Sequence, residues 1–194
     1  MKQSDLTFEP STHTFRLGDR VIPSITQILQ AQGLINTDYF TLEGRERGRL
    51  VHLACQFYDE GCLDWKTVDP RIVGYVRAWE KFRRESHFNP DASEVPLYSE
   101  TLLFAGIPDR WTRLYEKRQI VEIKTGVIAP WVALQTAAQD LLINDSRYSE
   151  RMAVQLKPDG NYTTKQFAKH IQDRQWFLAE LRCYKLRQDR GVAA

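Results

Sequence analysis

Hydrophobic and polar positions along the chain follow two different periods. Apolar residues recur every three or four positions where a helix would bury one face, and every second position where a strand would. Helices are predicted at residues 43–60, 69–86, 130–144 and 167–187, after a short helix opened by Pro23 and Ser24. Strands are predicted as a hairpin over 12–22, a three-strand meander over 95–103, 104–111 and 119–124, and a hairpin over 152–165.

This order of elements predicts the fold class. Helices, a meander, a helix, a hairpin and a final helix are typical of an α/β or α+β domain with a small mixed sheet. The length of 194 residues suits one domain, so residues 1–194 are expected to form a single unit.

The helical period also predicts which side chains face the core. In the helix over 43–60, the apolar positions are Leu50, Ala54, Phe57 and Tyr58, so His52 is expected on the opposite, polar face with Gly48, Arg45 and Asp59. In the last helix, the residues expected to be buried are Phe167, Ile171, Leu178 and Leu181.

Composition and charge add few restrictions. The chain is 42% hydrophobic and 27% charged, as in an ordinary globular domain, and its net charge of +2 neither requires nor excludes a nucleic-acid partner. The three cysteines form no paired motif, which favours reduced thiols in a cytoplasmic protein. The sequence has no run that reaches membrane-spanning length, so no membrane association is expected.

The chemically informative segment combines two motifs. Gly106-Ile107-Pro108-Asp109 is followed by Val121-Glu122-Ile123-Lys124. If the strands pair as a hairpin around a loop at 114–117, Asp109 lies across from Glu122. Lys124 then shares the face of Glu122.

Opposed carboxylates repel each other unless a cation lies between them. Oxygen ligands of this kind suit Mg²⁺ or Mn²⁺, and a lysine beside them can orient a water or stabilise charge on a phosphate. A solvent-facing hairpin with scattered charges is the alternative for Asp109, Glu122 and Lys124.

Several further segments, in the same order and spacing, resemble the PD-(D/E)xK nuclease superfamily, specifically its RecB-like exonuclease branch. Together with the two motifs above, the segments that carry the resemblance are Ile22–Leu29, Glu43–His52, Glu100, and Trp131 with Gln135. The resemblance implies a restriction-endonuclease-like core: a small mixed sheet flanked by helices, with an N-terminal helical part.

The resemblance also implies roles for individual residues. Metal ligands would be His52, Asp109, Glu122 and the backbone carbonyl of Ile123, with Lys124 as the catalytic lysine. The remaining implied roles are those of Gln135, which would order Lys124 or a DNA phosphate, and Glu100, which would bind a second metal or a water. On sequence alone, the alternatives are a solvent-facing His52, a strand-surface Glu100 and a helix-flank Gln135.

The chain departs from the family in two ways. Gln139 replaces the tyrosine that follows Gln135 in the family's helix. Some relatives hold an iron–sulfur cluster with four cysteines, which three cysteines cannot do, so no such cluster is expected. Arg45 is the predicted phosphate contact, whereas Lys81, Arg83 and Arg84 suit a solvated helix end.

The function implied by the resemblance is metal-dependent hydrolysis of DNA phosphodiester bonds with Mg²⁺ or Mn²⁺. An exonuclease acting on DNA ends or single strands in replication, recombination or repair is expected, phage-encoded and working with a recombination partner protein. The alternatives are an endonuclease of the same fold and a non-catalytic DNA-binding subunit.

Overall fold

A mixed five-stranded sheet forms the centre of the protein, in the order β10-β9-β8-β7-β4. The computed structural model describes residues 6–36, 41–112, 118–143 and 148–192. Within these ranges the strands are β1 (Leu6–Glu9), β2 (Thr14–Leu17), β3 (Arg20–Ile22), β4 (Ala92–Ser93), β5 (Leu97–Ser99), β6 (Phe104–Gly106), β7 (Arg110–Thr112), β8 (Gln119–Lys124), β9 (Glu150–Leu156) and β10 (Tyr162–Gln166). The central β8 is antiparallel to β7 and parallel to β9, which makes the sheet mixed.

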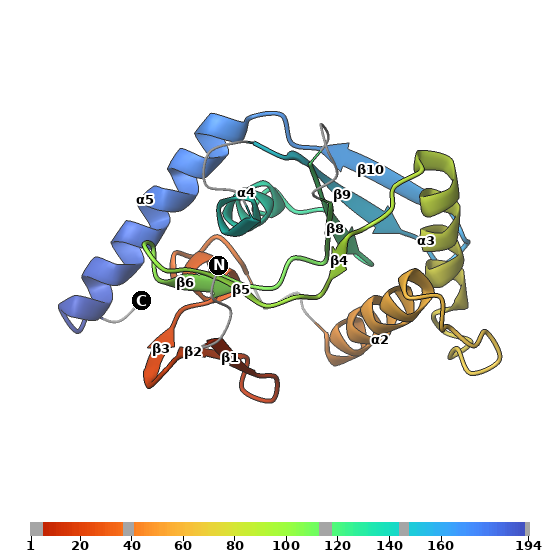
Figure 1. The fold of residues 1–194 in the computed structure, drawn as a ribbon, viewed down its shortest axis with the longest axis horizontal. Coiled ribbons are helices and arrows are strands. Elements are labelled where there is room, and N and C mark those ends of the chain that lie inside the picture. Colours follow the sequence, from red (N-terminus) through yellow and green to blue (C-terminus); the bar gives the residue numbers. More distant parts are fainter. Residues whose placement is uncertain (1–5, 37–40, 113–117, 144–147, 193–194) are drawn as a thin grey trace.

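Helices cover both faces of this sheet (Figure 1). They are α1 (Ile25–Ala31), α2 (Leu42–Asp59), α3 (Val73–Ser86), α4 (Val132–Ile143) and α5 (His170–Asp189). Val121 and Ile123 of β8 pack with α2 and α3, whereas Ile120 packs with α1, α4 and α5. Because side chains alternate along a strand, Glu122 and Lys124 lie on the α4 side. The predicted mixed α/β fold is confirmed.

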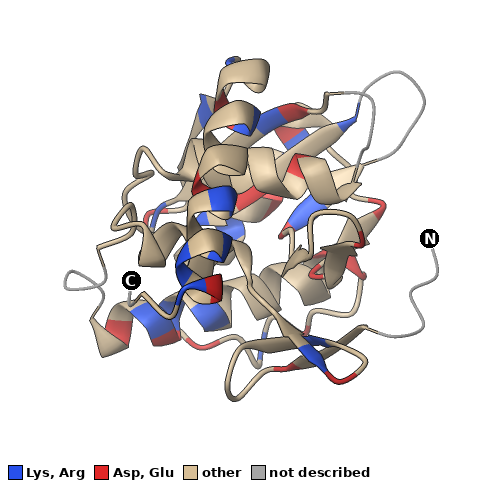
Figure 2. Cartoon of the chain, turned by 90° about the vertical axis from the view of Figure 1, so that its left-hand side faces the viewer, with Lys and Arg blue, Asp and Glu red and all other residues tan. Residues whose placement is uncertain are grey.

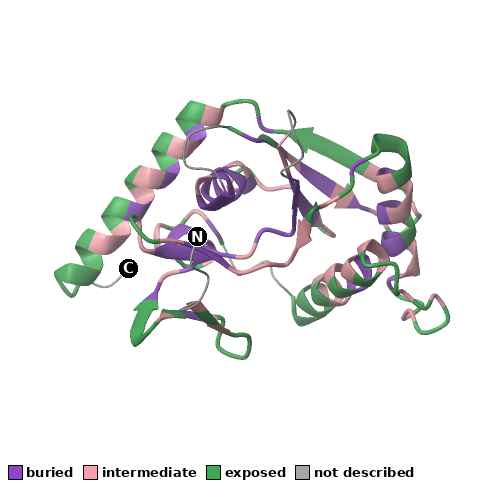
Figure 3. Ribbon diagram, viewed as in Figure 1, coloured by how far each residue is buried: buried purple, intermediate pink, exposed green. Residues whose placement is uncertain are grey.

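Helix α4 is buried on almost every side (Figure 3). It lies between the sheet and α5, and its buried residues include the polar Gln135, Gln139 and Asp140. Buried polar side chains need hydrogen-bond partners, so the neighbours of Gln135, Gln139 and Asp140 must supply them. The two amide side chains of α4 find such a partner at the end of β8.

The predicted strands over 95–103 and 104–111 are wrong as continuous elements. Pro108 cannot donate to a ladder, and Leu103 has a φ of 46°, so the chain leaves the extended conformation at both positions. Strands β5 and β6 form a separate two-stranded sheet, and β7 pairs with β4 and β8. The predicted three-strand meander is therefore divided between a two-stranded sheet and the central five-stranded sheet.

The N-terminal part contains the predicted hairpin and one further strand. The predicted hairpin over 12–22 is β2 and β3, and β1 pairs alongside it to make three strands. Ser24 caps α1 as expected, accepting from the Gln27 N–H at 3.1 Å, while the Gln27 side chain accepts from the Ser24 N–H at 2.8 Å. The expected helical part is thus preceded by a small sheet.

The buried faces of two helices differ from the prediction. In α2 the buried residues are Val51, Ala54 and Cys55, while Phe57 is 40% exposed. In α5, which begins three residues later than predicted, Ile171 is 52% exposed and Phe177 is buried in its place. None of the helices described is long and apolar enough to cross a membrane.

Candidate metal and active site

The pairing of β7 with β8 follows the predicted register. Arg110 lies opposite Val121 and Thr112 opposite Gln119. Asp109, just before β7, therefore stands beside the end of β8, where its Oδ2 accepts the Ile123 N–H at 2.6 Å. The loop assumed at 114–117 lies outside the described residues. Because of this register, Asp109, Glu122 and Lys124 lie at one end of the sheet.

Three side chains from different segments converge near this end of β8, and they are called here the metal-ligand cluster. His52 comes from α2, Glu94 from the connection between β4 and β5, and Asp109 from the position just before β7. His52 Nδ1 lies 3.1 Å from Glu94 Oε1 and 3.5 Å from Asp109 Oδ1. One ligand atom from each residue lies within 4.8 Å of the others. A nitrogen and two carboxylates at this spacing suit a divalent cation.

The electrostatics of the cluster favour a cation. Burial and the neighbouring Glu122 raise the pKa of Asp109 to about 7. Burial by itself would lower the pKa of His52, but Asp109 and Glu94 outweigh it and raise that pKa to about 9. Burial also opposes ionisation of Glu94, yet its contacts with His52 and Arg110 hold its pKa below the usual value. The carboxylates thus repel each other, and positive charge relieves the repulsion.

A buried arginine supports the cluster from behind. Arg110 is fully buried and donates to Asp59 Oδ2 at 2.5 Å, to Glu94 Oε1 at 3.0 Å and to the Asp109 carbonyl at 2.6 Å. Asp59 also pairs with Arg83, so the expectation of a solvated helix end is wrong for Arg83. Asp59 belongs to this buried pair and not to a polar helix face. The network ties α2, α3 and β7 together beneath the metal-ligand cluster.

A second group of side chains surrounds Glu122, and it is called here the lysine cluster. Glu122 Oε1 accepts from Lys124 Nζ and from Gln135 Nε2, both at 2.7 Å. Glu122 Oε2 accepts from Gln139 Nε2 at 2.8 Å. Lys124 Nζ also reaches Gln135 Oε1 at 3.2 Å and lies 5.1 Å from the centre of the Trp131 ring. The lysine is therefore held beside a carboxylate at the edge of the metal-ligand cluster.

The other predicted site residues are placed as follows. Glu100 is exposed in the turn after β5, where it accepts from the Tyr98 hydroxyl at 3.3 Å, and Glu94 takes the acidic position beside His52 and Asp109. Arg45 is exposed on α2. A Cβ at Gly48 would lie 3.8 Å from Thr125 Oγ1, so α2 passes close to the residue after β8.

Sequence reasoning missed Glu94 and the contact made by Gln139. Glu94 follows no recognisable motif, and its φ of 52° places it in the left-handed region that few side chains adopt. Gln139 carried a usable signal: it lies four residues after Gln135, hence on the same helix face. The departure from the family's tyrosine therefore supplies a second amide to Glu122.

Comparison with solved structures finds proteins of similar fold. No family model and no curated protein matches the chain. A crystal structure of an Eubacterium rectale protein, named "Putative exonuclease", has a similar fold with a TM-score of 0.53. The match covers 89% of this chain and 76% of that one at 11% identity. The protein therefore shares a mixed α/β fold with that protein and has a candidate divalent-metal cluster.

Proposed function

We propose that the protein is a divalent-metal-dependent deoxyribonuclease of the PD-(D/E)xK type. The observation that carries the proposal is the convergence of His52, Glu94 and Asp109 within ligand distance of one another. The Lys124–Glu122 pair next to them is a second support, because phosphodiester hydrolysis needs a cation and a further positive charge at the phosphate.

Each part of the site has a distinct role in this reaction. His52, Glu94 and Asp109 would hold Mg²⁺ or Mn²⁺, with Glu122 and the Ile123 carbonyl as further ligands. When bound, the cation would supply an activated water and a Lewis acid at the phosphate. Lys124 Nζ stabilises the charge that develops on the phosphoryl oxygens or orients the water, while Gln135 and Gln139 keep Glu122 in place.

The direct test is cleavage of a fluorescently labelled DNA oligonucleotide. Wild type should cut with Mg²⁺ or Mn²⁺ and stop cutting when the metal is chelated, and Lys124→Ala should be inactive. Lys165→Ala is the control, since Lys165 is exposed on the edge strand β10, two strands from β8. Equal cleavage by wild type and Lys124→Ala would refute the assignment of this site.

We further propose that the enzyme acts on ends. The sequence resemblance to exonucleases and the fold shared with the Eubacterium rectale protein support this mode. Linear DNA should then be degraded while closed circular single-stranded and duplex DNA stay intact. Cleavage of the circles would instead identify an endonuclease built on the same fold.

A further inference from the structure

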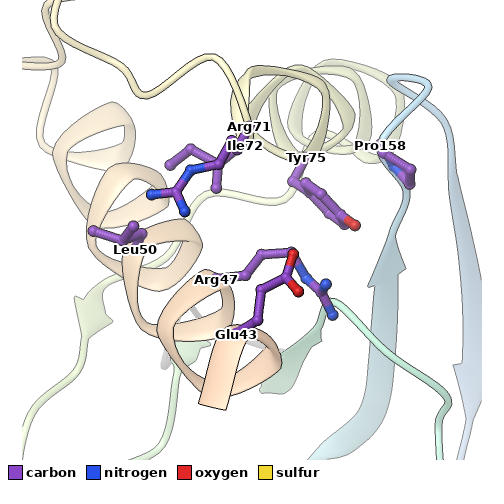
Figure 4. Close-up of a pocket in the computed structure, with 7 residues that line it drawn as sticks. All are labelled: Glu43, Arg47, Leu50, Arg71, Ile72, Tyr75 and Pro158. Carbon is purple, nitrogen blue, oxygen red and sulfur yellow. The ribbon is translucent and has the colours of Figure 1, made fainter. Parts of the chain in front are cut away.

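A pocket of about 200 Å³ lies between α2, the start of α3 and the turn that joins β9 to β10 (Figure 4). Its walls include Glu43, Arg47 and Leu50 of α2, Tyr75 of α3, and Pro158 of the turn. The helical period puts these three residues of α2 on a different side of the helix from His52. The pocket is therefore separate from the metal-ligand cluster.

The pocket is held open by a close backbone contact. A Cβ on Gly74 would lie 1.7 Å from the Pro158 carbonyl oxygen, so only glycine allows the turn to approach α3 this closely. This contact fixes Pro158 against the first turn of α3. The wall opposite α2 is therefore formed before any ligand arrives.

The two arginines that line the pocket differ in how their charges are satisfied. Arg71 donates to Asp69 Oδ2 at 2.6 Å and lies 3.9 Å from Glu46 Oε1. Arg47 makes neither a hydrogen bond nor an ion pair with any residue in the described part of the chain, and its Nε is buried without a partner. Its only described contact is with the Tyr75 ring, 5.7 Å from the centroid. A partly buried guanidinium in this state is suited to bind an anionic acceptor.

The position of Arg47 connects the pocket with the metal-ligand cluster. Arg47 and His52 are five residues apart on α2, roughly 7.5 Å along the axis and about 140° around it. Gly48 lies between them on the helix surface and faces Thr125 Oγ1, the residue after Lys124. A Cβ at Gly48 would lie 3.8 Å from Thr125 Oγ1, so Arg47 and His52 lie on either side of the point where α2 meets the residue after Lys124.

We propose that Arg47 binds an internal phosphodiester of the nucleic-acid strand whose scissile phosphate lies at the metal-ligand cluster. This inference rests on the proposed nuclease function. Guanidinium groups match phosphate geometry with two parallel hydrogen bonds. Glu43 lines the same pocket, so a singly charged diester is favoured over a terminal phosphate, which carries nearly two negative charges.

Basic residues elsewhere are less suited to this role. Lysines and arginines recur along α5 (Figure 2), but two of them already donate to backbone carbonyls. Lys185 donates to the Leu102 carbonyl at 2.6 Å, and Arg187 donates to the Ala31 carbonyl at 3.3 Å. Arg47 combines an unsatisfied guanidinium with a preformed pocket.

The test measures binding separately from cleavage. Fluorescence anisotropy with a labelled single-stranded oligonucleotide is performed in the Lys124→Ala background, so that the strand stays intact. Arg47→Ala should raise the Kd about tenfold and reduce the slope of log Kd against log salt by about 0.7, the value for one phosphate contact on a single strand. Arg47→Lys should restore part of the affinity, because it keeps the charge without the two parallel hydrogen bonds.

Arg49→Ala is the matched control, since Arg49 is exposed two residues further along α2 and should change the Kd less than about twofold. Thermal unfolding checks that each variant is folded. An unchanged Kd for Arg47→Ala, an equal loss for Arg49→Ala, or no binding by the parent would overturn the proposal. A strand that binds in an Arg47-dependent way but is never cut by the protein with native Lys124 would refute the nuclease function and leave the pocket standing.

A second set of oligonucleotides distinguishes an internal phosphodiester from a terminal phosphate. The Arg47→Ala effect should be the same for oligonucleotides with a terminal phosphate or hydroxyl at either end, because the contact is internal. An effect restricted to strands with a terminal phosphate would overturn the assignment to a diester.

Discussion

The metal-ligand cluster and the lysine cluster lie side by side at the end of β8, yet their charges are satisfied differently. In the lysine cluster, Lys124, Gln135 and Gln139 donate to the two carboxylate oxygens of Glu122. In the metal-ligand cluster, Asp109 has a pKa raised to about 7 because burial and Glu122 disfavour its charge. The contrast indicates that three donors hold Glu122 in place, whereas the metal-ligand cluster carries charges that a cation would relieve.

The largest effect is expected from the removal of a metal ligand. Asp109→Asn takes one negative charge from the metal-ligand cluster, so Mn²⁺ affinity should fall more than about 100-fold, since even outer-sphere partners cost 10- to 100-fold. Calorimetric titration measures the Kd. Asp91→Asn is the control, because Asp91 is exposed on the approach to β4. Unchanged affinity in Asp109→Asn would place the metal elsewhere.

The lysine should affect the chemical step and not the metal. Lys124→Ala is expected to lower kcat by about 10²- to 10³-fold, the cost of losing one group that stabilises the transition state. Its Mn²⁺ affinity should stay within a few-fold of wild type because Lys124 is no ligand. Parallel measurements of kcat and Kd test this separation, and a large loss of metal affinity would show that the two clusters act as one.

The buried network beneath the metal-ligand cluster should contribute to stability. Arg110→Met leaves the buried Asp59 without one of its two charged partners, which should cost about 3–5 kcal/mol of unfolding free energy. Urea denaturation gives this value. The half-exposed pair Arg77–Glu80 provides the control, since Glu80→Gln should cost less than about 1 kcal/mol. Similar losses in both variants would argue against a special role for the buried pair.

The two raised pKa values predict a pH dependence of fixed sign. His52 contributes stability below its ordinary pKa of 6.5 that is lost as the pH rises through about 9, and Asp109 loses its contribution as the pH rises through about 7. The metal-free protein should therefore become less stable between pH 6 and 9. Metal affinity should rise over the same range, by about tenfold per pH unit for each proton displaced.

Thermal unfolding with and without Mg²⁺ checks both trends. The stabilisation by Mg²⁺ should grow with pH in wild type and stay nearly flat in Asp109→Asn. Stabilisation that declines with pH would contradict the assignment of the two groups as ligands.

The smallest effect is expected from the second amide. Gln139→Leu removes one donor from Glu122 but leaves Lys124 and Gln135 in place, so kcat should fall about tenfold. The fall should appear in kcat with KM nearly unchanged, because Gln139 acts through Glu122. Gln139→Glu sharpens the result, since a second carboxylate there would repel Glu122 and lower kcat further. A change in KM alone would show that Gln139 contacts the substrate.

Structural features were predicted correctly where the periodic pattern was bounded by a turn or by a helix cap. The register of β7 on β8 was assumed from a hairpin closed at residues 114–117, and this register brings Asp109 beside Ile123. The start of α1 followed from the Ser24 cap. These features depend on neighbours in sequence, which is why they could be predicted.

The remaining features depend on contacts between distant segments. Glu94 joins His52, 42 positions earlier in the chain, and only the packing of α2 against the sheet brings them together. Asp59 was expected on a polar helix face, but Arg110 reaches it from β7 and makes its burial tolerable. Neither partner could be identified from spacing along the chain.

The central claim is that His52, Glu94 and Asp109 hold a divalent cation. Anomalous diffraction from a crystal soaked in Mn²⁺ tests it most directly. The account predicts an anomalous peak within about 2.5 Å of His52 Nδ1 or Nε2 and of the Asp109 and Glu94 carboxylates. A well-diffracting soaked crystal with no peak there, or with its Mn²⁺ at another site, would contradict it.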